Sequence, residues 1–399
     1  MGRMKELLIE MEERGYGESP ETFVCENCFS DEGLIELIID NGKEGFCSYC
    51  EKRSLTVLPL AQVISHIMES VESEWRDAAD SGTPYITREG GYQGPVFDTY
   101  DLLNDEEPIE ANHQELFEDI INTVYDRLWA RPFSMPFEED PIHEDWDVLV
   151  NIIQHHIRFI TFHDSASEIF NNKYWVYNDP RSAIEQIAKA IKRLNLIYIL
   201  PEGSPIYRAR FSEIDKYFTS ASDLGTVPFK LAKQANRMSP VGIPMFYGAL
   251  DSETAKSELD VHKSGFINYG EFCASRELIL IDFTQKISIP SIYSSRCESR
   301  SDIRLMNGFI NDFSKPIKRD GSEHIEYIPT QVITEYLRYN YMHNSNRIDG
   351  ILYNSVHNNK KACVIFIGNE MCQDKGISPS SPNNLILFLN KYWQEKVIK

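Results

Sequence analysis

Two pairs of cysteines near the N-terminus constrain the fold of this chain more than any other feature. Cys25 and Cys28 stand in CENC, and Cys47 and Cys50 stand in CSYC. Each C-x2-C pair can bind one side of a tetrahedral ion, and the spacer between the pairs lets the second close the other side. Four thiolates leave no open coordination position, so the pattern predicts a structural Zn2+ site. The alternatives are unbound thiols and a redox C-x2-C pair.

Length, composition and charge limit the class of protein. The chain has 399 residues, which suits two or three domains, and 42% hydrophobic with 12% aromatic residues is typical of globular proteins. No apolar run reaches the roughly 18 residues that span a bilayer, and the charged N-terminus is unlike a signal peptide. We therefore expect a cytoplasmic protein with no membrane partner. A net charge of −21 opposes a nucleic-acid partner.

Changes in composition and apolar periodicity along the chain predict four regions. Residues 1–80 form the zinc-binding segment with its four cysteines, and residues 81–110, with the SGT and REGGYQGP stretches, are the predicted linker. Apolar residues at helical spacing predict an all-α bundle over 111–196. From 197 to 399, short β-branched and aromatic runs alternate with helical stretches, which predicts a mixed α/β domain.

The predicted strands of this last region are short and bounded by turn residues. They are IYIL, PIYRARF, MFYGAL, ELILIDF, DGILYNSV and KACVIFIG. The helical stretches between them are SETAKSELDVH, SDIRLMNGFINDF and PTQVITEYLRYNYMH. Neither a dinucleotide-binding glycine motif nor a phosphate-binding Walker loop occurs, and zinc-hydrolase and serine-hydrolase motifs are also lacking from the sequence.

Five polar residues near the predicted strands are candidates for chemistry. They are Arg208 in PIYRARF, Arg237, Tyr247, Glu258 and Ser355. Each taken singly has a simple structural interpretation: a surface arginine, a half-packed tyrosine, a solvated helix glutamate or a turn serine. Their functional interpretation depends on their occurring together.

In this order, the motifs resemble the RES domain family. YRAR, then NRMSPVGIPMFYGALDSETAKSE, then RIDGILYNSV followed by KACVIF cover roughly residues 200–370. The resemblance implies an ADP-ribosyltransferase-like α/β fold and consumption of NAD+ by cleavage of the nicotinamide–ribose bond, with water or phosphate as acceptor. It places Arg208, Tyr247, Glu258 and Ser355 in the catalytic set and Arg237 in the same pocket.

These residue types suit that chemistry. Bond cleavage builds positive charge on the ribose, which a carboxylate such as Glu258 can stabilise. Arginine is the best donor for a diphosphate, which favours Arg208 and Arg237 as NAD-binding residues. Tyr247 offers an aromatic face to nicotinamide, and Ser355 a hydrogen-bonding group for the substrate. No activating base is apparent beside Ser355, so it is not expected to be a nucleophile.

The N-terminal half is similar to the HEPN/RES N-terminal arrangement, in which a HEPN-like bundle precedes the enzyme. The resemblance implies a toxin or defence effector. Small RES toxins usually occur with a separate antitoxin, and this longer form departs from them. Because a freely active NAD+ consumer would poison its host, we expect inhibition by an antitoxin or regulatory partner, by a closed N-terminal region or by a low basal rate, with the bundle as a regulatory or oligomerising module. Two alternatives stay open. Arg158 and His163 have the R-x4-H spacing of HEPN ribonucleases, and a RES-like domain without activity would make the chain a zinc-stabilised interaction protein.

Overall fold

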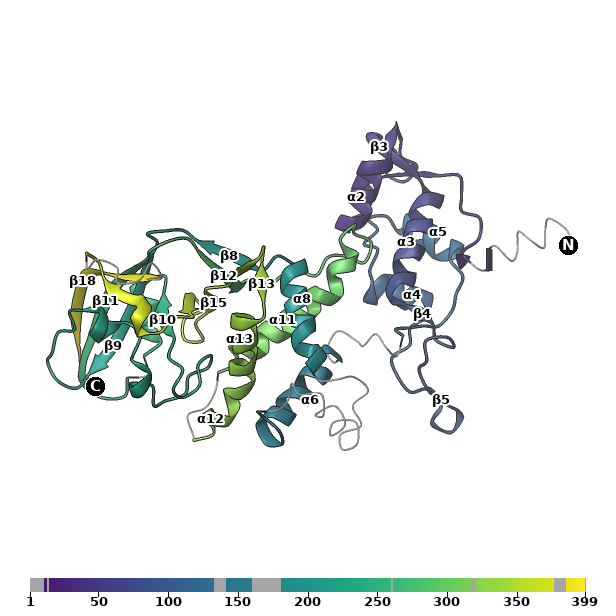
Figure 1. Ribbon diagram of the computed structural model, residues 1–399. Coiled ribbons are helices and arrows are strands. Elements are labelled where there is room, and N and C mark those ends of the chain that lie inside the picture. The colour runs from purple at the N-terminus through teal and green to yellow at the C-terminus, as the bar shows by residue number, and fades with distance from the viewer. Residues whose placement is uncertain are drawn as a thin grey trace. The chain divides into compact units, whose positions relative to one another are not determined.

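The chain folds into two compact units. The computed structural model describes residues 11–12, 14–132, 141–159, 181–259, 261–316, 321–376 and 385–398. Met1–Pro141 and Ser288–Arg304 form the N-terminal unit, and Ile142–Ile287 and Leu305–Lys399 form the C-terminal unit. Many elements of both units are labelled in Figure 1. Within the described residues, every helix is too short or too polar to cross a bilayer.

The N-terminal unit combines a small sheet, strand order β1-β3-β2, with the helices α2, α3 and α5. Its elements are β1 (Phe23–Cys25), η1 (Glu26–Cys28), α2 (Glu32–Asn41), β2 (Lys43–Phe46), β3 (Arg53–Pro59), α3 (Leu60–Glu74), β4 (Arg76–Asp77), β5 (Tyr85–Ile86), η2 (Thr87–Glu89), β6 (Gly91–Tyr92), α4 (Thr99–Asp101), η3 (Leu102–Glu106), α5 (Gln114–Thr123), β7 (Trp129–Ala130) and η5 (Cys297–Ser299).

Amphipathic helices build the core of this unit. In α3 the apolar residues recur every three or four positions, and Leu60, Ile64, Ile67 and Val71 are all fully buried. Asp31 is the N-cap of α2, and its carboxylate accepts a hydrogen bond from the backbone N–H of Leu34 at 2.8 Å. Trp75 and Trp129 are buried in the same cluster.

One mixed sheet organises the C-terminal unit, with strand order β17-β18-β11-β9-β10-β16-β15-β12-β8 among the described residues. Its elements are α6 (Pro141–His155), α8 (Arg181–Arg193), β8 (Ile197–Leu200), β9 (Pro205–Ser212), α9 (Ala221–Leu224), η4 (Phe229–Leu231), β10 (Phe246–Ala249), α10 (Ser252–Ser257), β11 (Gly265–Ala274), β12 (Leu278–Phe283), α11 (Arg300–Ser314), α12 (Glu323–Glu326), α13 (Ile328–Tyr339), β13 (Met342–His343), β14 (Asn346–Arg347), β15 (Gly350–Asn354), β16 (Lys361–Ile365), η6 (Asn369–Met371), β17 (Cys372–Asp374) and β18 (Ile386–Val397).

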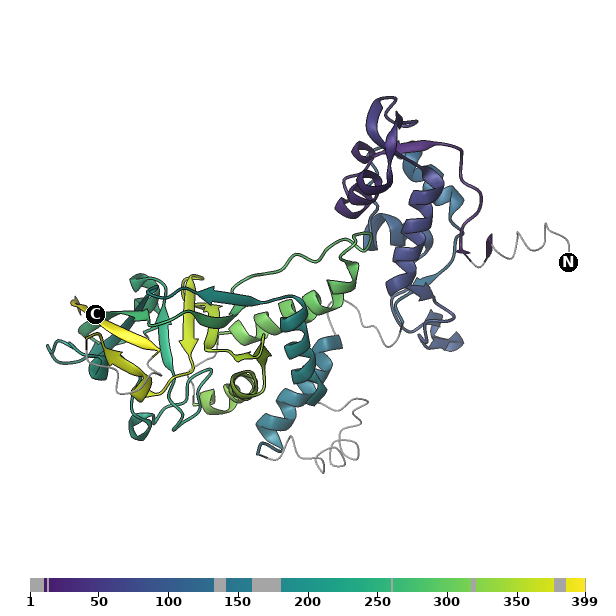
Figure 2. The same cartoon turned by 45° about the horizontal axis from the view of Figure 1, so that its top comes forward.

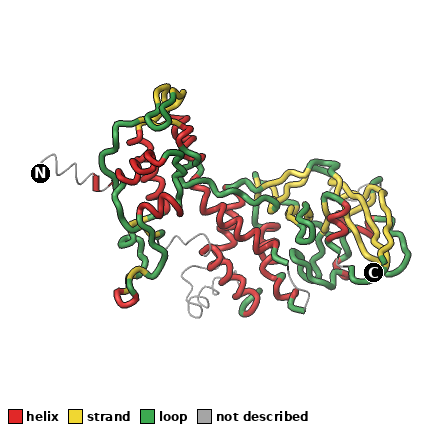
Figure 3. Tube along the Cα trace, turned by 180° about the vertical axis from the view of Figure 1, so that it is seen from behind, coloured by secondary structure: helices red, strands yellow, loops and turns green. Residues whose placement is uncertain are grey.

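Both faces of the sheet centre are covered. Alternate residues of β12 divide between two cores, with Ile281 and Phe283 packed among residues of α6, α8, α11 and α13, and Leu278 and Leu280 packed on the opposite side with α9. Figure 2 shows the strands of this sheet side by side, and Figure 3 separates them in yellow from the red helices. Burial on both faces explains why these strands have nearly continuous apolar sequences.

The predicted elements of the C-terminal region are largely confirmed. All six predicted strands occur, as β8, β9, β10, β12, β15 and β16, and the three helical stretches contain α10, α11 and α13. The two long strands β11 and β18 and the short strands β13, β14 and β17 were not predicted from the sequence. Gly265, Gly270 and Asn268 weaken the β signal of β11, and β18 runs from a buried half into an exposed, charged half.

The compact units differ from the predicted regions in two places. The predicted linker contributes Leu102, Leu103 and Ile109 to the N-terminal core. The predicted 111–196 bundle is divided, because α5 packs in the N-terminal unit whereas α6 and α8 pack in the C-terminal unit. Apolar periodicity identified these helices without identifying what each packs against.

A buried carboxylate holds the start of β12, and its removal is expected to destabilise the protein. Asp349 accepts from both terminal nitrogens of Arg276, at 2.6 and 2.9 Å, and from the Ile279 N–H at 2.9 Å. We predict that Asp349→Ala lowers the free energy of unfolding in urea by about 2 kcal/mol, because the Ile279 N–H and the half-exposed Arg276 guanidinium lose their shared acceptor. The exposed pair Lys263–Glu213 provides the control. Glu213→Ala should change stability by less than about 0.5 kcal/mol, and equal losses for both variants would contradict the interpretation.

Candidate active site and cysteine cluster

The candidate active site lies where two neighbouring strands separate. β9 pairs with β10 at one position, Tyr207 with Ala249, whereas it pairs with β11 along its whole length. Gly248 directly precedes Ala249 on β10, and a Cβ there would lie 2.5 Å from Ile206 Cγ2, so the two strands approach each other closely at this point. A cavity of about 850 Å3 opens beside them, within the usual size range of ligand sites.

Four of the five predicted site residues line this one cavity. They are Arg208, Arg237, Tyr247 and Glu258, which come from β9, the loop before β10, β10 itself and the end of α10. The fold therefore brings together residues that are well separated in the sequence.

Arg208 presents a buried atom without a protein partner. Its guanidinium lies 5.0 Å from the centre of the Phe246 ring, and its Nη1 is buried with no hydrogen-bond partner. Burial lowers the pKa of Arg208 to about 9, with the positive charge of Arg210 acting in the same direction, so the group is still charged at neutral pH. A buried cation with an unsatisfied donor is suited to an anionic ligand.

Glu258 presents the complementary group. It directly follows α10, which begins where the Asp251 carboxylate accepts from the Thr254 N–H at 2.8 Å, and its own N–H donates to the Thr254 carbonyl at 3.1 Å. Its Oε1 is buried without a hydrogen-bond partner. The cavity therefore contains one unsatisfied donor and one unsatisfied acceptor, both on ionisable side chains.

Tyr247 is fixed at its hydroxyl end. Its Oη accepts from the Met238 N–H at 3.3 Å and lies 3.0 Å from Ser239 Oγ. Burial raises the pKa of Tyr247 to about 12, so the phenol stays protonated at neutral pH. The fixed hydroxyl holds the ring in the cavity wall, where it can contact a flat ligand group.

Arg237 is held by backbone carbonyls. Its Nη1 donates to the Phe313 carbonyl and its Nη2 to the Lys315 carbonyl, both at 2.7 Å. Both acceptors lie at the end of α11, where carbonyls have no intrahelical partner. Burial lowers the pKa of Arg237 from its usual value. Arg237 thus brings positive charge to the cavity and also ties this loop to α11.

Ser355 is placed differently from its predicted role. It is 2% exposed, and its neighbours Asn354, Val356 and His357 line the cavity while Ser355 does not. Its Oγ accepts from the His357 N–H at 3.3 Å, and its own N–H donates to the Lys360 carbonyl at 2.8 Å. These are the contacts of a turn residue, so Ser355 shapes the β15–β16 turn.

Several cavity residues fall outside the predicted site. They are Arg210, Lys233, His262, Tyr327, Tyr353, Asn354 and His357. Tyr353 could have been identified, because it lies near the end of β15, two residues before the predicted Ser355. Lys233 and Tyr327 come from a loop and a helix start that the sequence does not connect to the site.

The four cysteines of the N-terminal unit form one cluster. The Sγ–Sγ distances are 3.7 Å for Cys25–Cys28, 3.6 Å for Cys25–Cys50 and 3.5 Å for Cys28–Cys47, and all four sulfurs lie within 4.8 Å of one another. Four sulfurs about 2.3 Å from a tetrahedral ion are about 3.8 Å apart. None of these four cysteines forms a disulfide, and the donor set fits such an ion.

The residues of the alternative ribonuclease hypothesis are described only in part. Arg158 donates from Nε to the Ile153 carbonyl and from Nη2 to the Gln154 carbonyl, each at 3.1 Å, and so binds the end of α6. His163 lies outside the described residues. The described contacts of Arg158 are those of a helix cap.

Two parts of the chain match known protein families. Residues 205–381 match the RES domain, so the unit that holds the cavity contains a RES domain. Residues 40–168 match HEPN/RES N-terminal domain 1. The chain therefore combines a HEPN/RES N-terminal domain with a RES domain.

Comparisons of the chain with curated proteins and solved structures do not extend this assignment. No curated protein matches the chain. Among solved structures, the "M.tuberculosis MbcT-MbcA toxin-antitoxin complex" is similar at 12% identity and a TM-score of 0.28, covering 53% of this chain and 92% of that one. This score is too low to assign a shared fold.

The unsatisfied guanidinium of Arg208 leads to a prediction about stability. We predict that Arg208→Met leaves the unfolding free energy of the ligand-free protein unchanged or raises it by about 1 kcal/mol, because a buried cation without full hydrogen bonding is costly. Arg210 is the matched control, since its Nη2 donates to the Gly225 carbonyl. Arg210→Met should lower stability by about 1–2 kcal/mol in urea titrations. If Arg208→Met is as damaging as Arg210→Met, Arg208 has a structural role.

Proposed function

We propose that the C-terminal unit is an NAD+-consuming enzyme that cleaves the bond between nicotinamide and ribose. One observation supports this most. Arg208 and Glu258 line the same cavity of a RES domain, and each has a buried atom without a hydrogen-bond partner. NAD+ carries a diphosphate that needs fixed positive charge and a ribose that becomes cationic during cleavage.

In the proposed reaction the C–N bond at the anomeric carbon breaks and its electron pair leaves with nicotinamide. The pyridinium nitrogen becomes neutral on leaving, so no strong general acid is required. The Glu258 carboxylate stabilises the cationic ribose, and the oxygen of the acceptor then bonds to the anomeric carbon and loses its proton. Water as acceptor gives ADP-ribose, and phosphate gives ADP-ribose-1″-phosphate.

The other residues hold the substrate in this proposal. Arg208 Nη1 binds the diphosphate, and Arg237 adds positive charge from the α11 end of the cavity. The Tyr247 ring contacts nicotinamide, with its orientation set by Ser239. Ser355 acts by positioning the turn that carries His357.

We further propose that the protein is a toxin or defence effector. Uncontrolled loss of NAD+ would poison the cell that makes the enzyme, so its activity requires control. An antitoxin or other regulatory partner, a closed N-terminal region or a low basal rate would each provide that control.

The proposed function predicts a specific loss in Glu258→Gln. This variant keeps the shape of the side chain and removes its charge, so nicotinamide release from NAD+ should fall at least about 100-fold. Products are resolved by mass after incubation with and without phosphate, which also identifies the acceptor. Glu253→Gln on the same helix is the control, because Glu253 is exposed and pairs with Lys360. It should retain wild-type activity.

Two results would count against this function. Intact NAD+ after incubation with the wild-type protein, with either acceptor and across protein concentrations, would favour the interaction-protein alternative. Full activity of Glu258→Gln would show that another group stabilises the ribose cation.

We also propose that the cysteine cluster binds one structural Zn2+. Cys25, Cys28, Cys47 and Cys50 would supply all four ligands, and the ion would link β1 to the turn that follows β2. With no ligand position left for water or substrate, its contribution is to the folding of the N-terminal unit.

The zinc proposal predicts about one zinc per chain in elemental analysis of purified protein. Cys28→Ser should abolish the bound zinc and lower the melting temperature, because Cys28 is fully buried in the core of this unit. Cys297→Ser, which changes a cysteine outside the cluster, should leave the metal content unchanged. Metal-free wild-type protein with an unchanged melting temperature would contradict the proposal.

A further inference from the structure

A short segment of the RES domain sequence is built into the other unit. Residues 288–304 lie inside the span that matches the RES domain, yet they belong to the N-terminal unit. We call Ser288–Arg304 the strap. The reverse also occurs, because residues 142–159 lie in the HEPN/RES match but belong to the C-terminal unit.

Apolar residues of the strap complete the N-terminal core. Ile292 and Tyr293 are each 1% exposed and pack in the same cluster as the buried residues of α2 and α3. Tyr293 Oη donates to the Glu107 carbonyl at 2.6 Å, and His66 Nε2 lies 2.8 Å from the Tyr293 carbonyl oxygen. The apolar side chains of the strap are thus part of the N-terminal core, and hydrogen bonds of Tyr293 join the strap to that unit.

The backbone of the strap lies directly against α2. A Cβ at Gly33 would be 2.4 Å from the Tyr293 carbonyl carbon and 2.4 Å from the Ser294 nitrogen, well inside contact distance. Gly33 is in the first turn of α2, where alanine would otherwise favour the helix. Glycine is therefore needed at position 33 because the backbone of the strap leaves no room for a Cβ atom.

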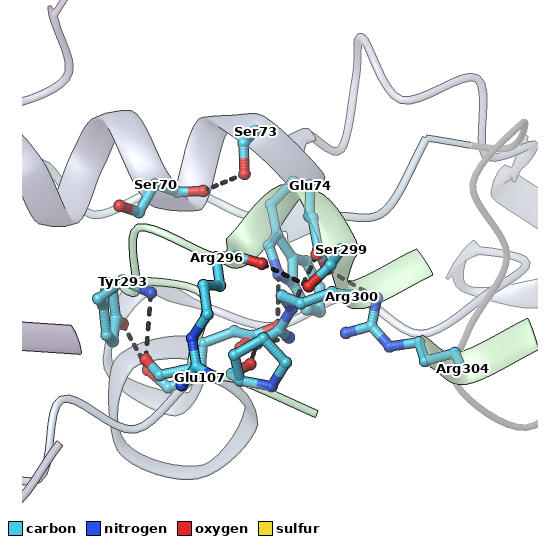
Figure 4. Close-up of polar contacts among 12 residues, drawn as sticks. Ser70, Ser73, Glu74, Glu107, Tyr293, Arg296, Ser299, Arg300 and Arg304 are labelled. Atoms are coloured by element: carbon cyan, nitrogen blue, oxygen red, sulfur yellow. Dashed lines mark hydrogen bonds and ion pairs between the residues drawn. The ribbon is translucent and has the colours of Figure 1, made fainter. Parts of the chain in front are cut away.

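A buried ion-pair cluster fixes the end of the strap (Figure 4). Arg300 Nε donates to Glu74 at 2.8 Å, and Arg300 Nη2 donates to both oxygens of Glu107 at 2.9 Å. Arg304 Nη1 lies 3.1 Å from Glu74, and Arg131 lies 3.1 Å from Glu107. Without the strap, this cluster would keep two buried carboxylates and one of its three guanidinium groups, which is a costly arrangement.

The strap runs directly into a helix that reaches the candidate active site. Arg300 is the first residue of α11, and the helix ends at Ser314. Beside that end, the carbonyls of Phe313 and Lys315 accept from Arg237, which lines the cavity. Arg237 is followed by Met238 and Ser239, which hold the Tyr247 hydroxyl.

We propose that the strap is a conformational device that makes the geometry of the cavity depend on the folded N-terminal unit. When the strap is seated, the first turn of α11 is fixed and its last turn holds Arg237. When the strap is released, α11 loses its anchored start, and the loop of Arg237 and Ser239 loosens. A partner or modification that unseats the strap would thereby weaken the site without touching it.

The seating of the strap is tested with Gly33→Ala in the full chain. We expect the melting temperature to fall by at least about 5 °C, although alanine is the better helix former. Asp40→Ala, on the exposed face of the same helix, is the control and should shift the melting temperature by less than about 2 °C. A Gly33→Ala protein as stable as wild type, or more stable, would overturn the packing of the strap against α2.

The coupling to the cavity is tested with milder variants, Tyr293→Phe and Arg300→Lys, which keep size or charge. Hydrogen exchange of the backbone amides in residues 236–239 should be faster than in wild type by at least about threefold, because their anchoring loosens. Asp40→Ala again serves as the control. If Tyr293→Phe and Arg300→Lys lower the melting temperature but leave hydrogen exchange in residues 236–239 unchanged, the strap is structural only and the coupling is overturned.

A kinetic measurement connects this inference to the proposed function, on which it rests. In Tyr293→Phe and Arg300→Lys, KM for NAD+ should rise several-fold with a smaller change in kcat, because substrate-holding groups are displaced. If the wild-type protein leaves NAD+ intact, the proposed function fails, while hydrogen exchange still decides the coupling. A normal KM in variants with faster exchange would contradict the link to substrate binding.

Discussion

The separation of β9 from β10 is the constraint on which the candidate site depends. Strand pairing between β9 and β10 is limited to Tyr207 and Ala249, and Arg208 of β9 and Tyr247 of β10 both line the cavity beside them. The loop before β10 and the end of α10 then add Arg237 and Glu258. Main-chain contacts fix this framework, because Arg237 is bonded to carbonyls and Tyr247 to an amide. The atoms left unsatisfied are those that a ligand can satisfy.

The buried carboxylates of the two units differ in their partners. In the N-terminal unit, Glu107 accepts from Arg300, Arg131 and the Trp75 indole N–H, so the cluster is closely paired and stabilises a single packing arrangement. In the cavity of the C-terminal unit, Arg208 and Glu258 each keep an atom without a partner. Paired buried charges are typical of structural sites, whereas unsatisfied ones are typical of binding sites, where stability is given up for function.

Much of the C-terminal fold follows from the sequence, because strands buried on both faces are short apolar runs bounded by turn residues. The sequence also led to four residues that line one cavity, Arg208, Arg237, Tyr247 and Glu258, most of which lie on or beside regular elements. Their catalytic roles stay a prediction. Ser355 was misplaced because sequence order cannot distinguish a lining residue from the turn residue beside it. The strap was missed for a similar reason. The packing of Ile292 and Tyr293 depends on Gly33 and Glu107, which are distant in the sequence, so no local pattern indicates it.

The central claim is that this cavity breaks the nicotinamide–ribose bond of NAD+, and proton NMR of the reaction mixture tests it most directly. The resonances of the nicotinamide ring report its cationic state while it is joined to ribose. With full-length wild-type protein, these resonances should be replaced by those of free nicotinamide, in equal amount to a single ADP-ribosyl product. Unchanged ring resonances after prolonged incubation with stoichiometric protein, in water and in phosphate, would contradict the account.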